Sequence, residues 1–228
     1  MSLSLSGVNV RYGSSQVIND VNMDVPDQGV VCLLGRNGVG KTTLLKSIAG
    51  LLRLASGMIS YNGRDLTRLA PDRIARLGMR LVLQDGNVFP GLTVAEHLQL
   101  GLGAVGKHRS GQLLESFPAL HARLGQQVQT LSGGERKMLV IAQALASDPR
   151  LLLLDEPTEG VQPTVVQEIE RVIQRVAAER AVVLVEQNID VALRVGGYGY
   201  VMEKGRIVEQ GMLVDIARKG LLHRYLVV

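Results

Sequence analysis

Tryptophan is absent from this chain of 228 residues, and aromatic residues make up only 3% of it. Proteins that bind single-stranded nucleic acid stack the bases on aromatic side chains, so this scarcity argues against such a partner. The formal net charge is only +4, and the basic residues are scattered along the sequence. We interpret them mainly as solvated surface residues, with contact to a partner or a phosphate as the minority case. We therefore expect no nucleic acid partner.

Cysteine and long apolar runs are also scarce. The single cysteine, Cys32, lies inside an apolar segment, which excludes an internal disulfide bond and fits a reducing compartment. No apolar run approaches the roughly 18 residues of a membrane span. Residues 1–10 alternate serine and leucine without the basic start of a secretory signal. We expect a cytoplasmic protein that could still dock on a membrane partner.

Hydrophobic residues make up 46% of the chain and charged residues 20%, as in a folded globular protein. Period-two patterns and short apolar runs predict strands at residues 3–10, 17–25, 58–61, 80–83, 151–155, 181–185, 198–203 and 207–209. Helical periodicity follows at 41–52, at 93–146 with a loop at 103–111, after the strand at 151–155, and at 189–195. Strands alternating with helices predict an α/β fold with a parallel sheet. We expect one domain, 1–228, with its core in 1–84 and 148–228 and a helical insertion in 85–147.

Residues 35–42, Gly-Arg-Asn-Gly-Val-Gly-Lys-Thr, fit the phosphate-binding pattern G-x-x-x-x-G-K-[ST] and directly follow the apolar run 30–34. Glycines let backbone N–H groups approach an anion closely, and a helix that begins near Lys41 would aim its positive end at the same phosphates. In this motif the lysine contacts the β- and γ-phosphates, and the hydroxyl of Thr42 coordinates Mg²⁺. An ordinary glycine turn before a helix is the simpler alternative. We expect nucleotide binding by Gly35, Asn37, Gly38, Gly40, Lys41, Thr42 and Thr43.

The apolar strand at 151–155 ends in two adjacent carboxylates, Asp155 and Glu156. Neighbouring strand residues point to opposite sides, so we expect the two side chains to do different work. Asp155 is expected to face the phosphate loop and hold Mg²⁺, and Glu156 to act on an attacking water as general base. A pair of solvated carboxylates at a strand end is the alternative, and the nearby phosphate motif makes it the weaker one.

A third pattern, Leu-Ser-Gly-Gly-Glu at 131–135, precedes a helix predicted to run to about residue 146. Ser132 can cap that helix, while Gly133 and Gly134 leave backbone N–H groups open to an anion. By itself this is a helix cap with no further function. Together with the other two motifs, this pattern predicts a second phosphate site. A single bound nucleotide needs only one phosphate site, so the second is left without a ligand in the same chain.

The order of phosphate loop, LSGGE and apolar strand with Asp-Glu resembles the ATP-binding cassette (ABC) ATPases over essentially the whole chain. The resemblance implies a P-loop NTPase fold with a RecA-like parallel core, an N-terminal antiparallel β-subdomain and an inserted helical subdomain. In that family two cassettes pack head to tail, and the LSGGE of one completes the ATP site of the other. Ser132, Gly133, Gly134 and Glu135 would then serve the opposite subunit's ATP.

The resemblance also assigns roles to single residues. Tyr12 matches the aromatic residue that stacks on adenine. Gln84 matches the glutamine that contacts Mg²⁺ and the attacking water and relays the nucleotide state to a transmembrane partner. An exposed turn tyrosine is the alternative for Tyr12.

Two positions depart from the usual family pattern. Gln187 stands where a histidine usually follows the strand after Asp-Glu; it can contact the γ-phosphate by hydrogen bonds but cannot become charged. Gln162 replaces an aspartate common in the loop after Asp-Glu, which puts coupling across the dimer through this loop in doubt. The segment Val185-Glu186-Gln187-Asn188 resembles the smaller ATPase of branched-chain amino acid importers and of their relatives for urea and short amides.

The leading hypothesis is an ATPase subunit that uses ATP and Mg²⁺ at the cytoplasmic face of the membrane. Its implied partners are permease subunits, a second ATPase that is a related chain or another copy, and, indirectly, a solute-binding protein. An exporter ATPase is a near alternative. A cassette protein acting on DNA or the ribosome would usually carry a coiled coil, a zinc insertion or a second cassette. A structural role without ATP is the weakest hypothesis, because Lys41, Thr42, Asp155 and Glu156 are all present.

Overall fold

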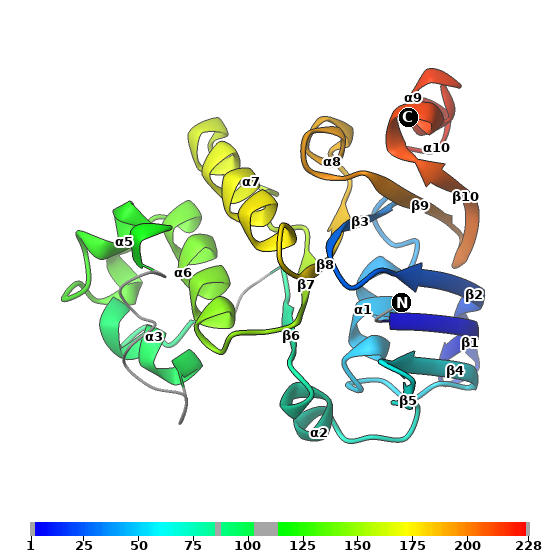
Figure 1. Ribbon diagram of the computed structural model, residues 1–228, viewed down its shortest axis with the longest axis horizontal. Coiled ribbons are helices and arrows are strands. Elements are labelled where there is room, and N and C mark those ends of the chain that lie inside the picture. The colour runs from blue at the N-terminus through cyan, green and yellow to red at the C-terminus, as the bar shows by residue number, and fades with distance from the viewer. Residues whose placement is uncertain (1–2, 85–87, 103–113, 227–228) are drawn as a thin grey trace.

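The structure, a computed structural model, describes residues 3–84, 88–102 and 114–226. Its larger sheet has six strands in the order β10-β9-β3-β8-β7-β6 (Figure 1). Strands β9, β3, β8, β7 and β6 are mutually parallel, and β10 pairs antiparallel with β9. Their bounds are β3 Gly29–Leu34, β6 Met79–Val82, β7 Leu151–Asp155, β8 Ala181–Glu186, β9 Tyr198–Glu203 and β10 Arg206–Met212. The predicted α/β class with a parallel sheet is confirmed.

A second sheet is antiparallel and has the order β2-β1-β4-β5. Its strands are β1 Leu3–Tyr12, β2 Ser15–Val25, β4 Ser56–Tyr61 and β5 Arg64–Asp65. The turn at Asn62-Gly63 joins β4 and β5, and both residues have positive φ, 50° and 75°. Such values suit the tight turns that asparagine and glycine favour.

The helices are α1 Lys41–Ile48, α2 Pro71–Arg76, α3 Val94–Leu102, α5 Pro118–His121, α6 Gly133–Ala146, α7 Pro163–Ala177, α8 Ile189–Val195, α9 Leu213–Arg218 and α10 Leu221–Leu226, with a 3₁₀ turn at Val128–Thr130. Figure 1 shows α1 beside the antiparallel sheet, while α3, α5 and α6 form a group at the opposite side of the molecule. In the part of the chain that the structure describes, no helix is long and apolar enough to cross a membrane.

The parallel sheet lies between two hydrophobic cores, and β3 shows how. Cys32 and Leu34 belong to the core that also contains α6 and α7 residues, whereas Val31 and Leu33 belong to the core shared with α1 and the antiparallel sheet. Alternate strand residues point to opposite faces, so a strand buried on both faces is apolar throughout. Burial raises the pKa of the Cys32 thiol to about 12, which fits its expected role as a small core residue.

Some expectations need correction or lie outside the description. The helix predicted at 41–52 ends at Ile48, because Gly50 takes a left-handed φ of 73° and turns the chain. Leu51, which the predicted helix included, therefore lies beyond the helix and is 51% exposed. The loop predicted at 103–111 lies outside the described residues.

Parallel strands end at one edge of the sheet, and this edge positions the candidate site. The phosphate motif follows β3, Gln84 follows β6, Asp155 and Glu156 lie at the end of β7, and Gln187 follows β8. Ligands of open α/β sheets bind at this carboxyl edge.

Candidate functional site

The loop between β3 and α1 requires glycine for two different reasons. A Cβ on Gly35 would lie 2.6 Å from the carbonyl oxygen of Met202, so only a hydrogen fits. Gly40 has φ 112°, a left-handed value, and precedes α1 without a side chain to cap it. The first amides of α1 therefore point out of the helix with no side-chain acceptor from Gly40, as a phosphate site needs.

Lys41 is folded back under this loop and is only 4% exposed. Its ammonium donates hydrogen bonds to the carbonyl oxygens of Gly35 at 2.7 Å and Arg36 at 3.0 Å. It also forms an ion pair with Glu156, Nζ to Oε1, at 3.0 Å. An ammonium has three donors, and these three acceptors hold its charge at the carboxyl end of β7.

The carboxylates of Asp155 and Glu156 line two different cavities, Asp155 with Thr42 and Gln84 and Glu156 with Gln187. Asp155 ends the strand, but Glu156 lies beyond it with φ 46°, a left-handed conformation that redirects its side chain. The carboxylate of Glu156 consequently reaches Lys41 at the phosphate loop. Strand alternation stops at Asp155, so the direction of the Glu156 side chain depends on its own backbone angle.

Asp155 is 1% exposed, and neither of its carboxylate oxygens has a hydrogen-bond partner in the described part of the chain. Burial raises the pKa of Asp155, and the nearby hydroxyl of Thr42 and ammonium of Lys41 oppose part of that rise. A cavity of about 500 Å³ is lined by Asp155, Thr42 and Gln84 together. The three expected magnesium ligands thus share one cavity.

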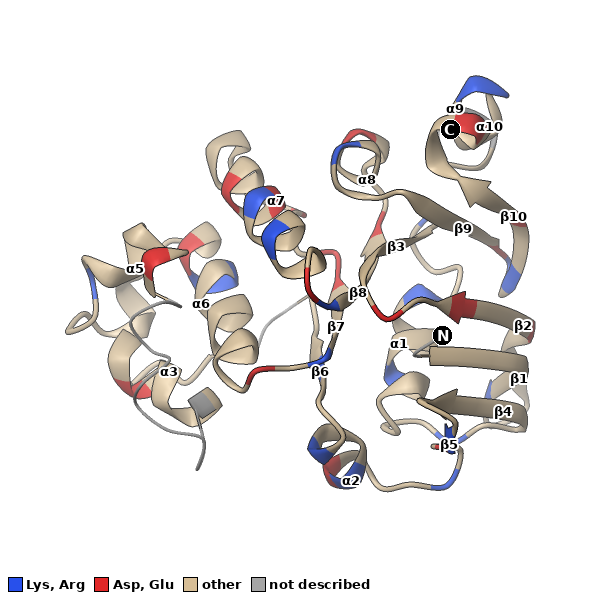
Figure 2. Ribbon diagram, in the orientation of Figure 1, with Lys and Arg blue, Asp and Glu red and all other residues tan. Residues whose placement is uncertain are grey.

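Gln84 also contacts the loop after β7, through a hydrogen bond from its Nε2 to Oε2 of Glu159. Lys137 of α6 donates to the carbonyl oxygens of Glu159 and Glu156, the latter at 3.3 Å. Partial burial and the neighbouring Glu156 raise the pKa of Glu159. Figure 2 shows acidic segments where the chain passes from β7 toward α7, and Lys and Arg spread over many elements. The loop after β7 is therefore the meeting point of β6, β7 and α6.

The LSGGE segment begins α6, on the opposite side of the view from α1 (Figure 1). Ser132 and Glu135 form a reciprocal capping box: Oγ of Ser132 accepts from the Glu135 amide at 3.3 Å, and the Glu135 carboxylate accepts from the Ser132 amide at 2.8 Å. The Ser132 hydroxyl also donates to Glu135 at 2.8 Å. The hydrogen bond from the Ser132 backbone amide to the Glu135 carboxylate lowers the pKa of Glu135. Ser132 caps the helix, as one reading of the sequence predicted, and the structure does not bring 132–135 to the phosphate loop of the same chain.

Three other sequence candidates lie on separate elements. Tyr12 ends β1 with its side chain 48% exposed. Gln187 lines a second cavity, of about 790 Å³, together with Glu156. Gln162 is the N-cap residue of α7.

One buried pair was missed by the sequence reasoning. The hydroxyl of Thr158 donates to Oε1 of Glu186 at 2.7 Å, and both residues are buried. Burial raises the pKa of Glu186. The available signal was a carboxylate directly ending a fully apolar strand at 181–186, the same pattern that singled out Asp155.

Comparison with known proteins agrees with this geometry. The family model described as ABC transporter matches residues 18–159. The chain is 41% identical over 211 residues to the high-affinity branched-chain amino acid transport ATP-binding protein BraG of Pseudomonas aeruginosa, covering 90% of this chain and 91% of BraG. It is 37% identical to the probable branched-chain amino acid transport ATP-binding protein LivF of Archaeoglobus fulgidus, covering 90% and 89%.

Among solved structures, an ATP-binding subunit of an ABC transporter superposes with a TM-score of 0.85 at 28% identity, covering 97% of this chain and 94% of the other. The matched fold includes both sheets and the helical group, since nearly the whole chain is covered. On the family match and these relatives, the chain belongs to the ABC transporter family and is one of its ATP-binding, ATP-hydrolysing subunits.

Proposed function

We propose that the chain is the ATPase subunit of an importer for branched-chain amino acids or a related small solute such as urea or a short amide. The observation that carries its ATPase role is the convergence of Lys41, Thr42, Asp155 and Glu156 at the carboxyl edge of the sheet. The importer and the solute class are supported by similarity to BraG and LivF over nine-tenths of the chain.

ATP binds with its phosphates in the loop before α1. The backbone there supplies amides, Lys41 supplies positive charge, and glycine keeps the space open. The residues proposed to contact the phosphates are Gly35, Asn37, Gly38, Gly40, Lys41, Thr42 and Thr43. The half-exposed ring of Tyr12 is proposed to stack on the adenine.

Mg²⁺ fits the cavity shared by Thr42, Asp155 and Gln84. A buried carboxylate is costly unless donors or a cation balance its charge; Asp155 has the Thr42 hydroxyl and the Lys41 ammonium nearby but no oxygen within hydrogen-bond geometry of a described donor. Oxygen ligands of this kind suit a hard divalent ion. When bound, the ion would neutralise phosphate charge during hydrolysis.

Glu156 is proposed as the general base for the attacking water. Lys41 holds its carboxylate beside the phosphate loop, so the base and the phosphate charge would be adjacent. Gln84 and Gln187, which follow neighbouring strands, are proposed to orient the water and to contact the γ-phosphate by hydrogen bonds. Gln187 has no ionisable proton, so its role would be positional.

Ser132, Gly133, Gly134 and Glu135 are proposed to contact ATP bound to a second ATPase subunit, either a related chain or another copy. Their place at the start of α6, away from α1, supports service to another subunit (Figure 1). Residues 1–84 and 148–228 would then act as the nucleotide-binding core, and 85–147 as the helical subdomain.

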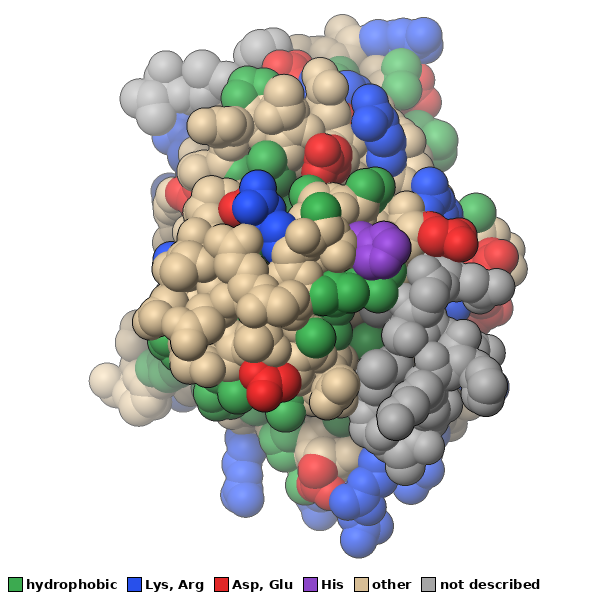
Figure 3. All heavy atoms as spheres, turned by 90° about the vertical axis from the view of Figure 1, so that its left-hand side faces the viewer, with side chains coloured by type: hydrophobic (Ala, Val, Ile, Leu, Met, Phe, Trp, Pro, Cys, Tyr) green, Lys and Arg blue, Asp and Glu red, His purple; other side chains and the backbone are tan. Residues whose placement is uncertain are grey.

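Permease subunits are proposed as membrane partners, which would place the chain at the cytoplasmic face of the membrane. Leu100 is 52% exposed and lines the same cavity as Gln84, and Phe89 is 57% exposed. Figure 3 shows hydrophobic side chains among polar ones on the face that carries the helical group. Contact there would place a partner beside the residue proposed to sense ATP.

The full chain carrying an affinity tag, purified from its own cell membranes in mild detergent, tests this function. We expect permease subunits and a second ATPase to co-purify, and a small apolar amino acid, urea or a short amide to stimulate ATP hydrolysis when the solute-binding protein is added. Recovery with ribosomes or DNA would contradict a transport role. Stimulation of ATP hydrolysis by an exported lipid or polysaccharide would contradict the importer assignment and favour an exporter.

A further inference from the structure

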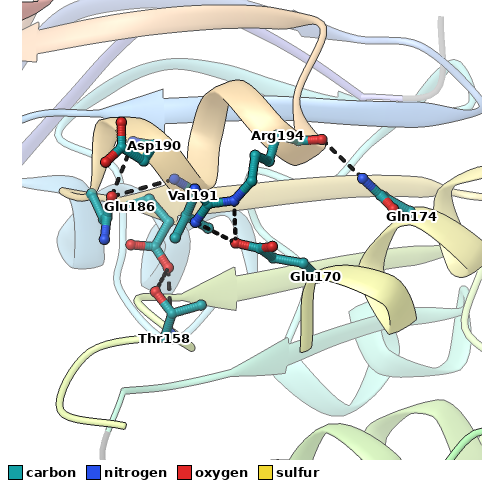
Figure 4. Close-up of polar contacts among 8 residues, drawn as sticks. Thr158, Glu170, Gln174, Glu186, Asp190, Val191 and Arg194 are labelled. Atoms are coloured by element: carbon teal, nitrogen blue, oxygen red, sulfur yellow. Dashed lines mark hydrogen bonds and ion pairs between the residues drawn. The ribbon is translucent and has the colours of Figure 1, made fainter. Parts of the chain in front are cut away.

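Glu186 is a buried carboxylate whose position links two segments of the site. It ends β8, is 2% exposed, and immediately precedes Gln187. The hydroxyl of Thr158 donates to its Oε1 at 2.7 Å, and the Thr158 amide approaches the same oxygen at 3.4 Å (Figure 4). Thr158 belongs to the loop that carries Glu156.

The same carboxylate also lies close to the segment after β8. Burial raises the pKa of Glu186, and the nearby backbone amide of Asn188 opposes part of that rise. The Glu156 amide, in turn, donates to the carbonyl oxygen of Val185 at 3.0 Å. Two residues of the loop after β7, Glu156 and Thr158, therefore donate to the last two residues of β8, and Gln187 follows directly in the chain.

Glu156 needs such an anchor. Its φ of 46° is left-handed, a conformation that a side chain other than glycine keeps only when its surroundings impose it. The Glu156 side chain is bound on one side by Lys41. The Thr158–Glu186 hydrogen bond fixes the chain just beyond Glu156, so it restrains where the Glu156 carboxylate can point.

We propose that Glu186 is a positioning residue for ATP hydrolysis, which acts by holding Thr158 of the loop after β7 against the end of β8, so that Glu156 and the adjoining Gln187 keep a fixed mutual arrangement. The inference rests on the proposed roles of Glu156 and Gln187. Neither Glu186 nor Thr158 touches the phosphate in this account.

A second buried carboxylate in the same cavity supplies the control. Glu170 of α7 is 6% exposed and lines the cavity with Glu186. Its Oε1 accepts from Arg194 Nε at 2.9 Å and Nη2 at 2.8 Å. Figure 4 shows this pair joining α7 to α8, whereas Glu186 is bound by the hydroxyl and amide of Thr158. Glu170 serves helix packing, and Glu186 serves the two site segments.

The decisive variants of the full chain are Thr158→Val, which keeps the shape and removes the hydroxyl, and Thr158→Ser, which keeps the hydroxyl. Single-turnover ATP hydrolysis at protein excess should slow about 10-fold or more in Thr158→Val, while the Kd for ATP changes by less than about threefold. Thr158→Ser should recover most of the rate. Glu186→Gln keeps an acceptor for the hydroxyl and should slow the rate less than Glu186→Leu.

Amide hydrogen exchange supplies a readout that does not depend on activity. Thr158→Val should speed exchange in both segments, 156–160 and 186–189, and Glu170→Gln should leave both unchanged while lowering thermal stability. Unchanged exchange at 186–189 in Thr158→Val, a rate within about twofold of wild type, or equal slowing in Glu170→Gln would overturn the positioning role. If wild-type protein neither binds nor hydrolyses ATP, the proposed function itself is wrong and the inference falls with it.

Discussion

Two helices of this protein begin at glycine-rich segments, yet their first turns are stabilised differently. At α1, Gly40 offers no side chain, and Lys41 is buried against Glu156. At α6, Ser132 and Glu135 satisfy each other in a capping box, and Glu135 pairs with a half-exposed Arg123 at 2.8 Å. The start of α1 leaves amides for an external anion, while the start of α6 is completed from within the chain.

This difference bears on the proposed dimer. The Ser132 hydroxyl already donates to Glu135. A phosphate brought by a second subunit would compete with the Glu135 carboxylate for that proton. The backbone amides at the start of α1 have no side-chain acceptor from the cap residue, whereas Ser132 must exchange one partner for another, as Lys41 must to reach a phosphate.

Lys41→Met is expected to have the largest effect on this comparison. It leaves Glu156 buried without its cation, which should lower the free energy of unfolding by about 3–5 kcal/mol and remove ATP binding. Arg123→Met removes the corresponding cation at α6, but the side chains of that pair are 45% and 21% exposed, so the loss should be below about 1 kcal/mol. Urea unfolding measures the free energy of unfolding of both variants. Equal losses in the two variants would contradict the claim that the buried Lys41–Glu156 pair contributes more stability than the exposed Arg123–Glu135 pair.

Replacing Gly40 or Gly133 by alanine tests whether each helix start requires a glycine. Gly40→Ala places a Cβ 2.7 Å from Cδ1 of Ile18 at φ 112°, and should cost about 1–3 kcal/mol of stability. Gly133→Ala meets no atom within 4 Å and gains helix propensity, so its stability should stay within about 0.5 kcal/mol of wild type or rise. Both free energies come from the same unfolding measurements. A free energy of unfolding for Gly40→Ala equal to that of wild type would contradict the described conformation of the loop before α1.

Ser132→Ala should lower the free energy of unfolding by about 1 kcal/mol, because the Glu135 amide loses its acceptor. Thermal melting of the full chain measures this, with Ser147→Ala, at the other end of α6, as the matched control. The control removes a hydroxyl that donates to the Ala144 carbonyl oxygen. A loss of stability in Ser132→Ala no larger than that in Ser147→Ala would contradict a stabilising role for the capping box.

The smallest effect concerns pH. The pKa of Glu135 is lowered in the folded protein, chiefly by the Ser132 amide, so the charged carboxylate stabilises the fold above its ordinary pKa of 4.5. That contribution is lost as pH falls through the folded pKa. Glu135→Gln should therefore lose less stability on acidification than wild type. Melting curves recorded on both sides of that pKa check this, and parallel pH profiles would contradict it.

The sequence was sufficient to predict the larger features. The apolar strand before Gly35, the helix after Gly40 and the parallel core are present, since local glycine and hydrophobic patterns specify them. Leu51 was misplaced because helical periodicity continued past the point where Gly50 turns the chain. Periodicity alone contains no signal for a left-handed turn.

Contacts between distant segments could not be predicted. The approach of Glu156 to Lys41 depends on one left-handed backbone angle, for which the sequence pattern contains no signal. The pairing of Thr158 with Glu186 joins the ends of two strands that become neighbours only in the sheet. That Asp155 and Gln84 share a cavity was expected from the family resemblance and not from local sequence pattern. Such contacts follow from strand order, which a single sequence does not determine.

The most direct test of the central claim measures ATP binding and single-turnover hydrolysis by the full chain with Glu156→Gln. The variant keeps the shape of the side chain and loses its basicity. We predict an ATP affinity close to that of wild type, and hydrolysis slower by about 10²- to 10⁴-fold. Hydrolysis at a near-normal rate would contradict the account, because the carboxylate held by Lys41 would then not be the base.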